Sequence, residues 1–185
     1  IMTHYIEIKL LPDQEFSPGL LMNALFAKFH RALVEFGHGE LGVSFPQAHK
    51  TLGDTIRMHG SQGARERFMA LGWLKGLTDY SSATAIIAVP DGCKYRVVKR
   101  VQAKSSVERM YRRSVKKGWL SVEEAEVKMN VGKEQQLKLP YIQLKSGSTG
   151  QSFRLFIQQG KIVDSPVAGN FSAYALSDAA TIPWF

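Results

Sequence analysis

The chain has 185 residues, of which 44% are hydrophobic and 22% are charged, and this composition excludes a disordered or collagen-like protein. Its single cysteine, Cys93, excludes an intramolecular disulfide and a zinc site built from cysteines, which fits a reducing compartment, so we expect a cytoplasmic protein. No run of about 18 apolar residues occurs, so the sequence predicts no membrane span.

Positive charge gathers in the second half of the chain. The net charge is +8, and residues 1–90 contain eight Lys and Arg and eight Asp and Glu, whereas residues 91–185 contain sixteen and eight. From Lys94 to Lys117 there are ten basic residues and one acidic residue, Glu108. This concentration indicates a surface that binds a polyanion.

The first half predicts a sheet covered by two helices. An alternating β-branched run predicts a strand over residues 4–11, and the helix after it begins at Ser17 and Pro18 and ends at Gly37. The patterns further predict a helix at 64–77, strands at 41–45 and 55–59, and a buried strand at 83–89. The order βαββαβ is that of a ferredoxin-like domain, which we expect to span residues 1–92.

The second half predicts an α/β domain over residues 93–185, so the expected fold class is α+β. A strand is expected at 95–104, followed by a basic helix that ends at Gly118. Two residue pairs have the capping-box spacing that begins a helix: Ser105 with Glu108, and Ser121 with Glu124. Further strands are expected at 141–144, 153–157 and 171–176.

The basic helix carries cations at separations of three, four, seven and eight residues, which share one helical face. These residues are Arg109, Arg112, Arg113, Lys116 and Lys117. Neighbouring like charges destabilise a helix, but a row of phosphates facing them would reverse that cost. The alternative is a solvated face without a partner, and the shortage of acidic residues favours the phosphates.

Two residues upstream of this helix are suited to nucleic-acid bases. Arg100 and Gln102 are two apart on an expected strand, so their side chains project from the same face. Arg can pair with guanine and Gln with adenine, although both side chains are equally suited to phosphates or to packing on the helix.

Histidine is the side chain best suited to proton transfer near neutral pH, and five histidines occur. No pair has a convincing metal-ligand spacing, so we predict no metal. His30 lies beside the apolar stripe of the first long helix, one turn after Phe26. This position is suited to catalysis, although a packed or capping role is the commoner one.

Small hydroxyl and glycine residues gather at 146–152, before the strand that begins near Phe153. Such a segment can hold phosphate or ribose oxygens. The other interpretation is a flexible connection between strands, and the composition of the segment by itself favours this interpretation.

Six segments together resemble a known family: HYIEIKL, LFAKFHRAL, GVSFP, YRVVKRVQAKS, STGQSFRLFI and the terminal PWF. In these segments, which occur in the family's order, the chain resembles the CRISPR-associated repeat-RNA endoribonucleases of type I-F systems. The resemblance implies a ferredoxin-like first half and a second half that carries an arginine-rich helix.

The resemblance also implies RNA contacts. The family's basic helix enters the major groove of a repeat hairpin, so phosphate contacts are expected for Arg112, Arg113, Lys116 and Lys117. Two of these are lysines where the family often has arginines. Arg100 and Gln102 match a base-reading pair near the foot of the stem, and Phe153 matches an aromatic residue that stacks on the RNA close to the cut.

Three positions match the family's active site. The resemblance implies that His30 transfers the proton, that Ser146 holds the ribose hydroxyl, and that Tyr174 orients the imidazole. Ser148 is expected to assist in positioning. Cleavage would be independent of metal and cofactor, with the RNA 2′-hydroxyl attacking the adjacent phosphate to leave a cyclic phosphate and a 5′-hydroxyl.

Family members keep the cut hairpin and act within a guide-RNA surveillance complex, so the expected partners are the repeat RNA and other subunits of that complex. Departures from the family pattern near the site, at Lys145 and Gly147, leave a non-catalytic RNA-binding subunit as the alternative. A double-stranded DNA binder fits the net charge but not the resemblance.

Overall fold

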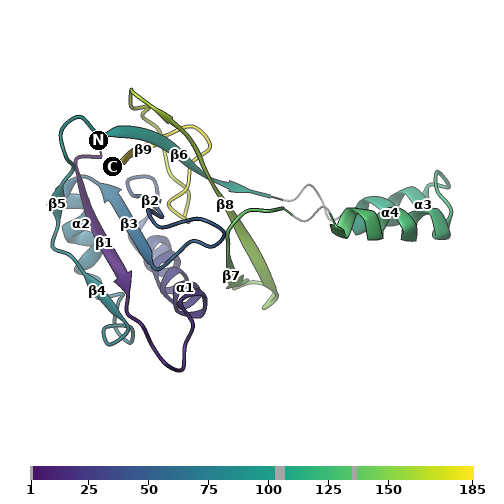
Figure 1. Cartoon of the computed structure of the whole chain (residues 1–185), viewed down its shortest axis with the longest axis horizontal. Helices are drawn as coiled ribbons and strands as arrows, with labels where there is room; N and C mark the ends of the chain where they lie inside the picture. The colour runs from purple at the N-terminus through teal and green to yellow at the C-terminus, as the bar shows by residue number, and fades with distance from the viewer. Residues whose placement is uncertain (1, 103–106, 135–136) are drawn as a thin grey trace.

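The computed structural model describes residues 2–102, 107–134 and 137–185. Two antiparallel sheets form the body of the molecule, and a pair of helices stands apart from it (Figure 1). The first sheet is built from β1 (His4–Leu10), β2 (Gly42–Ser44), β3 (Thr55–Gly60), β4 (Ser81–Ala83) and β5 (Ile87–Ala88). The second contains β6 (Lys94–Val101), β7 (Tyr141–Lys145), β8 (Ser152–Val163) and β9 (Thr181–Trp184).

The first sheet has the order β2-β3-β1-β4, with β5 also paired to β1. Helix α1 (Pro18–Phe36) follows β1, and α2 (Gln62–Met69) follows β3. Both helices pack against this sheet, where the Phe29 ring meets the edge of Phe68 at 5.6 Å between centroids. The strand order with its two helices is the ferredoxin-like arrangement, and the α+β fold class is confirmed.

Helix α1 begins and ends where its capping residues predict. The Ser17 hydroxyl accepts a hydrogen bond from the backbone N–H of Leu20 at 3.2 Å, and Pro18 occupies the first turn. Gly37 ends the helix with φ of 93°, a conformation that favours glycine. The buried residues of α1 recur at helical spacing: Leu21, Met22, Leu25, Phe26, Phe29, Ala32 and Leu33.

The second sheet has the order β7-β8-β6-β9 and packs against α1 through β7. The Asn23 side chain on α1 accepts a hydrogen bond from the backbone N–H of Gln143 on β7 at 3.0 Å. Ile142 and Leu155 of this sheet belong to the same apolar core as Ile8 of the first sheet. Helix α1 therefore contacts both sheets, and residues on α1 are positioned by both halves of the chain.

The C-terminal residues attach the second half to the first sheet. Arg57 on β3 donates to the backbone oxygen of Phe185 and to the Glu7 carboxylate on β1, each at 2.9 Å. The ring of Phe185 also meets Tyr5 with centroids 4.8 Å apart. The two ends of the chain consequently lie close together (Figure 1).

Helices α3 (Val107–Lys116) and α4 (Val122–Glu134) pack on each other and form an arm that projects from the body (Figure 1). Gly118, with φ of 73°, ends α3 as predicted. The capping box of α4 is confirmed, because Ser121 Oγ accepts from the N–H of Glu124 at 3.1 Å and the Glu124 carboxylate accepts from the N–H of Ser121 at 2.9 Å. The capping box expected from Ser105 lies outside the described residues.

Two sequence predictions for the first half need correction. The second helix ends at Met69 rather than at residue 77, because Gly72 and Gly76 adopt positive φ angles that end helical structure. The expected buried strand at 83–89 is two short strands, β4 and β5, whose residues are mostly exposed. Among the strands that the structure describes, both pair with β1 alone, so this segment is a sheet edge rather than the sheet interior.

Two corrections concern the second half. Residues 171–176, expected as a strand, form a turn, in which the N–H of Ala175 donates to the carbonyl of Ser172 at 2.8 Å. Strand β9 was not predicted from the sequence; it contains Pro183, which is tolerated because β9 is an edge strand. No helix in the described ranges is long and apolar enough to cross a membrane.

Candidate functional site

His30 lies on the face of α1 that borders the second half of the chain. Its Nδ1 atom lies 2.7 Å from the carbonyl oxygen of Ala173. A carbonyl oxygen only accepts hydrogen bonds, so Nδ1 carries the proton in this contact. In the neutral imidazole Nε2 is then unprotonated and is the nitrogen that can accept a proton from a bound molecule.

Tyr174 contacts the same imidazole on the face of its ring. The two rings stack with centroids 4.2 Å apart and an angle of 16° between their planes. The turn that carries Tyr174 is closed by its own hydrogen bonds, one from the N–H of Tyr174 to the Ser172 hydroxyl at 3.2 Å. Ala175 in this turn has φ of 57°, which is uncommon for a residue other than glycine. The turn thus orients both the carbonyl and the ring that hold His30.

Ser146 begins the turn between β7 and β8. Its backbone N–H donates to the carbonyl of Gln151 at 2.8 Å, and its own carbonyl accepts from the N–H of Gly150 at 2.9 Å. The Ser146 hydroxyl lies 3.2 Å from that of Ser148 and accepts from the N–H of Thr149 at 3.3 Å. The expected positioning pair, Ser146 and Ser148, is therefore in mutual contact.

These groups meet at one cavity of about 260 Å³. Its lining consists of Ala27, His30, Arg31, Leu144, Lys145, Ser146, Gly147, Phe153 and Tyr174. His30, Ser146 and Tyr174 come from three separate segments, and the packing of α1 against β7 and the 171–176 turn unites them. Arg31 and Lys145 were not predicted as site residues, although Arg31 directly follows His30 and is one turn after Ala27.

A second cavity of about 400 Å³ adjoins the first through Tyr174. Arg100, the penultimate residue of β6, and Gln102, just beyond the strand, both line it, so the structure brings the expected base-reading pair together. The Arg100 guanidinium lies 5.7 Å from the ring centroids of both Phe153 and Tyr174. Arg100 and these two rings thus connect the two cavities.

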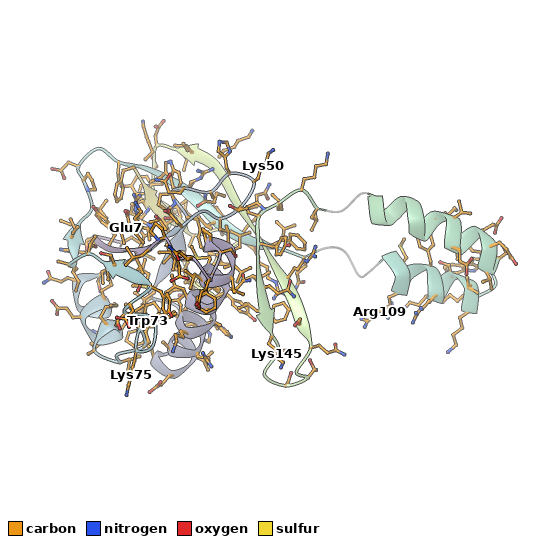
Figure 2. All side chains as sticks on the ribbon, turned by 60° about the horizontal axis from the view of Figure 1, so that its bottom comes forward. Glu7, Lys50, Trp73, Lys75, Arg109 and Lys145 are labelled. Atoms are coloured by element: carbon orange, nitrogen blue, oxygen red, sulfur yellow. The ribbon has the colours of Figure 1, made fainter. Side chains whose placement is uncertain are left out.

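The cations of the arm are exposed, as expected of a charged binding face. They comprise Arg109, Arg112, Arg113 and Lys116 on α3, with Lys117 just after the helix. Arg109 lies at the end of the arm nearer the body (Figure 2). Lys117 Nζ lies 4.6 Å from the ring centroid of the exposed Trp119. None of these five residues lines the His30 cavity or the Arg100 cavity.

Within the described ranges, no group of three or more His, Cys, Asp or Glu residues is arranged so that it could hold a metal ion.

The comparison with known proteins covers nearly the whole chain. The family model described as CRISPR-associated protein (Cas_Csy4) matches residues 5–185. The chain belongs to the Cas_Csy4 family of CRISPR-associated proteins. It is similar to the CRISPR-associated endonuclease Cas6/Csy4 of Escherichia coli (strain UTI89 / UPEC), with 50% identity over 184 residues. It is also similar to the CRISPR-associated endonuclease Cas6/Csy4 of Pseudomonas aeruginosa (strain UCBPP-PA14), with 42% identity over 187 residues.

Both alignments cover the whole of this chain and the whole of the relative. The family resemblance drawn from the sequence segments is therefore confirmed for the full length of the Cas_Csy4 match, including the segments that carry His30, Ser146 and Tyr174.

Proposed function

We propose that this chain is an endoribonuclease that binds the hairpin of a CRISPR repeat transcript and cuts it at the 3′ base of the stem. One observation carries the proposal. A proton acceptor, a serine hydroxyl group and an orienting ring line a single small cavity in a member of a family whose relatives are named endonucleases. These are the groups that cleavage by the RNA's own 2′-hydroxyl requires from a protein.

In the proposed reaction, Nε2 of His30 takes the proton of the 2′-hydroxyl that lies upstream of the scissile phosphate. The resulting oxygen attacks phosphorus, a 2′-O–P bond forms, and the P–O5′ bond breaks. The 5′ oxygen leaves with the proton that the imidazolium of His30 returns, so the products are a 2′,3′-cyclic phosphate and a 5′-hydroxyl. RNA supplies the nucleophile in this scheme, and no step needs a metal or cofactor.

Ser146 and Tyr174 act by positioning. The Ser146 hydroxyl would hold the ribose in an attacking geometry, and its contact with Ser148 at 3.2 Å restricts the direction in which it points. Tyr174, stacked on His30, together with the Ala173 carbonyl keeps Nε2 facing the cavity. The proposal assigns proton transfer to His30 alone.

The remaining contacts set the register of the hairpin. Arg100 and Gln102 would read base edges at the foot of the stem, where the narrow RNA major groove opens, while Phe153 stacks on the RNA beside the cut. The cationic face of α3 would lie along the stem phosphates. The product hairpin stays bound after cleavage, and the protein then serves as a subunit of a type I-F surveillance complex in the cytoplasm.

Incubation of the protein with a repeat hairpin in excess chelator tests the proposal. The expected result is a single cut at the 3′ base of the stem, with the 5′ fragment remaining bound. A hairpin that is bound tightly but stays intact would instead identify a non-catalytic RNA-binding subunit. Equal affinity for RNA and DNA hairpins of the same sequence would indicate a double-stranded DNA binder.

A further inference from the structure

Two cations share the His30 cavity. Arg31 follows His30 on α1, and Ala27, one turn earlier, completes that wall of the cavity with a small side chain. Lys145 is the last residue of β7, directly before Ser146, and lies at the turn end of the β7–β8 hairpin (Figure 2). The two residues are far apart in the sequence, and both line this cavity because α1 packs against β7.

The residues that line the cavity include two cations and no Asp or Glu. Among the residues that the structure describes, neither Arg31 nor Lys145 forms an ion pair or a side-chain hydrogen bond. Some cations elsewhere on the body do form ion pairs, such as Arg67 with Glu40 at 3.1 Å.

The cavity is also too small for its charges to act on separate ligands. A volume of about 260 Å³ lies just below the range of about 300 to 1,000 Å³ that is typical of small-molecule sites. Two cations facing one such cavity without a counter-charge repel each other unless an anion lies between them. One phosphate group, bound beside His30 and Ser146, supplies that anion.

We propose that Arg31 and Lys145 are catalytic residues that hold the non-bridging oxygens of the scissile phosphate and stabilise the charge that develops on it. This inference rests on the proposed function. A phosphodiester carries one negative charge, and a second develops as the 2′ oxygen attacks and the proton moves to His30. Cations already placed at those oxygens interact more strongly with the doubly charged transition state than with the substrate.

Arg31 and Lys145 would bind the phosphate oxygens in different ways. The Arg31 guanidinium can hold two phosphate oxygens at once with parallel hydrogen bonds, whereas the Lys145 ammonium acts as a point charge. In this assignment His30, oriented by Tyr174, transfers the proton, and Ser146 positions the ribose. Arg31 and Lys145 bind the phosphate.

Single-turnover cleavage at saturating protein tests this assignment. We expect Arg31→Ala and Lys145→Ala each to slow cleavage about tenfold, and the double variant to slow it about 100-fold. These losses are smaller than those expected in a closed active site, because this cavity is open to water, which weakens electrostatic interactions. Affinity for an uncleavable hairpin with 2′-deoxyribose upstream of the cut should change by at most about threefold. Arg31→Lys, which keeps the charge but not the paired hydrogen bonds, should recover only part of the lost rate.

Lys50→Ala is the matched control, since Lys50 is an exposed cation remote from Lys145 (Figure 2) and its loss lowers the net charge equally. It should cleave at the wild-type rate. A Lys50→Ala protein that is slowed as much as the Arg31 and Lys145 variants would overturn the assignment, because the loss of net charge alone would explain all three.

The outcomes separate this inference from the proposed function. If the wild-type protein cuts the hairpin and the double variant cuts it equally fast, the assignment of Arg31 and Lys145 is wrong and the endoribonuclease proposal stands. A double variant that loses affinity in proportion to its rate would also overturn the assignment, because general attraction to RNA would explain it. A wild-type protein that leaves the hairpin intact would overturn both.

Discussion

His30 is held by two contacts that act on different parts of its imidazole. The Ala173 carbonyl, 2.7 Å from Nδ1, selects the tautomer, and the Tyr174 ring, at 4.2 Å between centroids, selects the plane of the ring. Sequence patterns could not predict this arrangement, because His30, Ser146 and Tyr174 are distant in the chain. On spacing alone a packed or capping role was the commoner one for His30, and only the family resemblance favoured catalysis.

Replacement of His30 by alanine should abolish cutting while leaving hairpin affinity within about threefold of the wild type, since the imidazole moves a proton and holds little of the RNA. Single-turnover cleavage and a binding titration measure the two effects. His49→Ala, which removes an exposed histidine that lines neither cavity, is the control and should cut normally. A His30→Ala protein that cleaves at the wild-type rate would refute the site assignment.

Two substitutions at Tyr174 separate its ring from its hydroxyl. Tyr174→Phe keeps the stacked ring and should retain most of the cleavage rate, whereas Tyr174→Ala should lose about tenfold, matching an aromatic pair worth about 0.5 to 1.5 kcal/mol. Cleavage rates of the two variants check this. Equal and large losses in both would mean that the hydroxyl, rather than the stacked ring, is the active part.

At the scale of elements, a helix or strand could be predicted where capping residues and a regular apolar pattern mark it in the sequence. Helix α1 was predictable because Ser17, Pro18 and Gly37 mark its ends and its apolar stripe is regular. The 171–176 segment was mistaken for a strand because Phe171 and Leu176 are apolar, yet burial of a turn requires apolar residues as much as burial of a strand does. That turn carries Tyr174, so the missed element is part of the candidate site.

The arm separates binding from chemistry, because its cations line neither cavity. Arg112→Ala combined with Arg113→Ala should therefore weaken hairpin binding and lower the slope of log affinity against log salt by about 2, or about 1 per lost phosphate contact. Binding titrations from low to high salt measure the slope. At saturating protein, the hairpin should still be cut at the same position, and a shifted cut would show that α3 also sets the register.

The whole molecule contains a buried titratable group that links stability to pH. His59 on β3 is fully buried, with Nε2 2.8 Å from the Ser44 hydroxyl. Burial, and then the positive charges of Arg57 and Arg65, hold the pKa of His59 well below its ordinary value of 6.5. Below pH 6.5 the imidazole of His59 therefore binds a proton in the unfolded chain but not in the folded chain. The free energy of unfolding consequently decreases as the pH is lowered through that range.

The free energy of unfolding should fall by up to about 1.4 kcal/mol per pH unit below pH 6.5 because of His59 alone. Urea denaturation of the wild type and of His59→Gln at pH 7.5 and 5.5 tests this. The variant is expected to start from lower stability, because it disturbs a buried contact, but to lose less between the two pH values. Equal losses in both proteins would contradict the assignment.

The α+β class was predictable from the alternation of patterns, whereas the contact between the two halves was not. The terminal Phe185 reaches Arg57 and Tyr5, and α1 touches both sheets, so residues distant in the chain build one core. No local pattern encodes such contacts. They matter for function because the His30 cavity forms where α1 meets the second sheet.

The most direct test of cleavage by the RNA's own hydroxyl compares two repeat hairpins in excess chelator. One carries ribose upstream of the scissile phosphate, and the other carries 2′-deoxyribose at that position. We predict that the ribose hairpin is cut to a cyclic phosphate and a 5′-hydroxyl, and that the deoxyribose hairpin binds equally well and stays intact. Cleavage of the deoxyribose hairpin at the same phosphate would contradict the proposed mechanism.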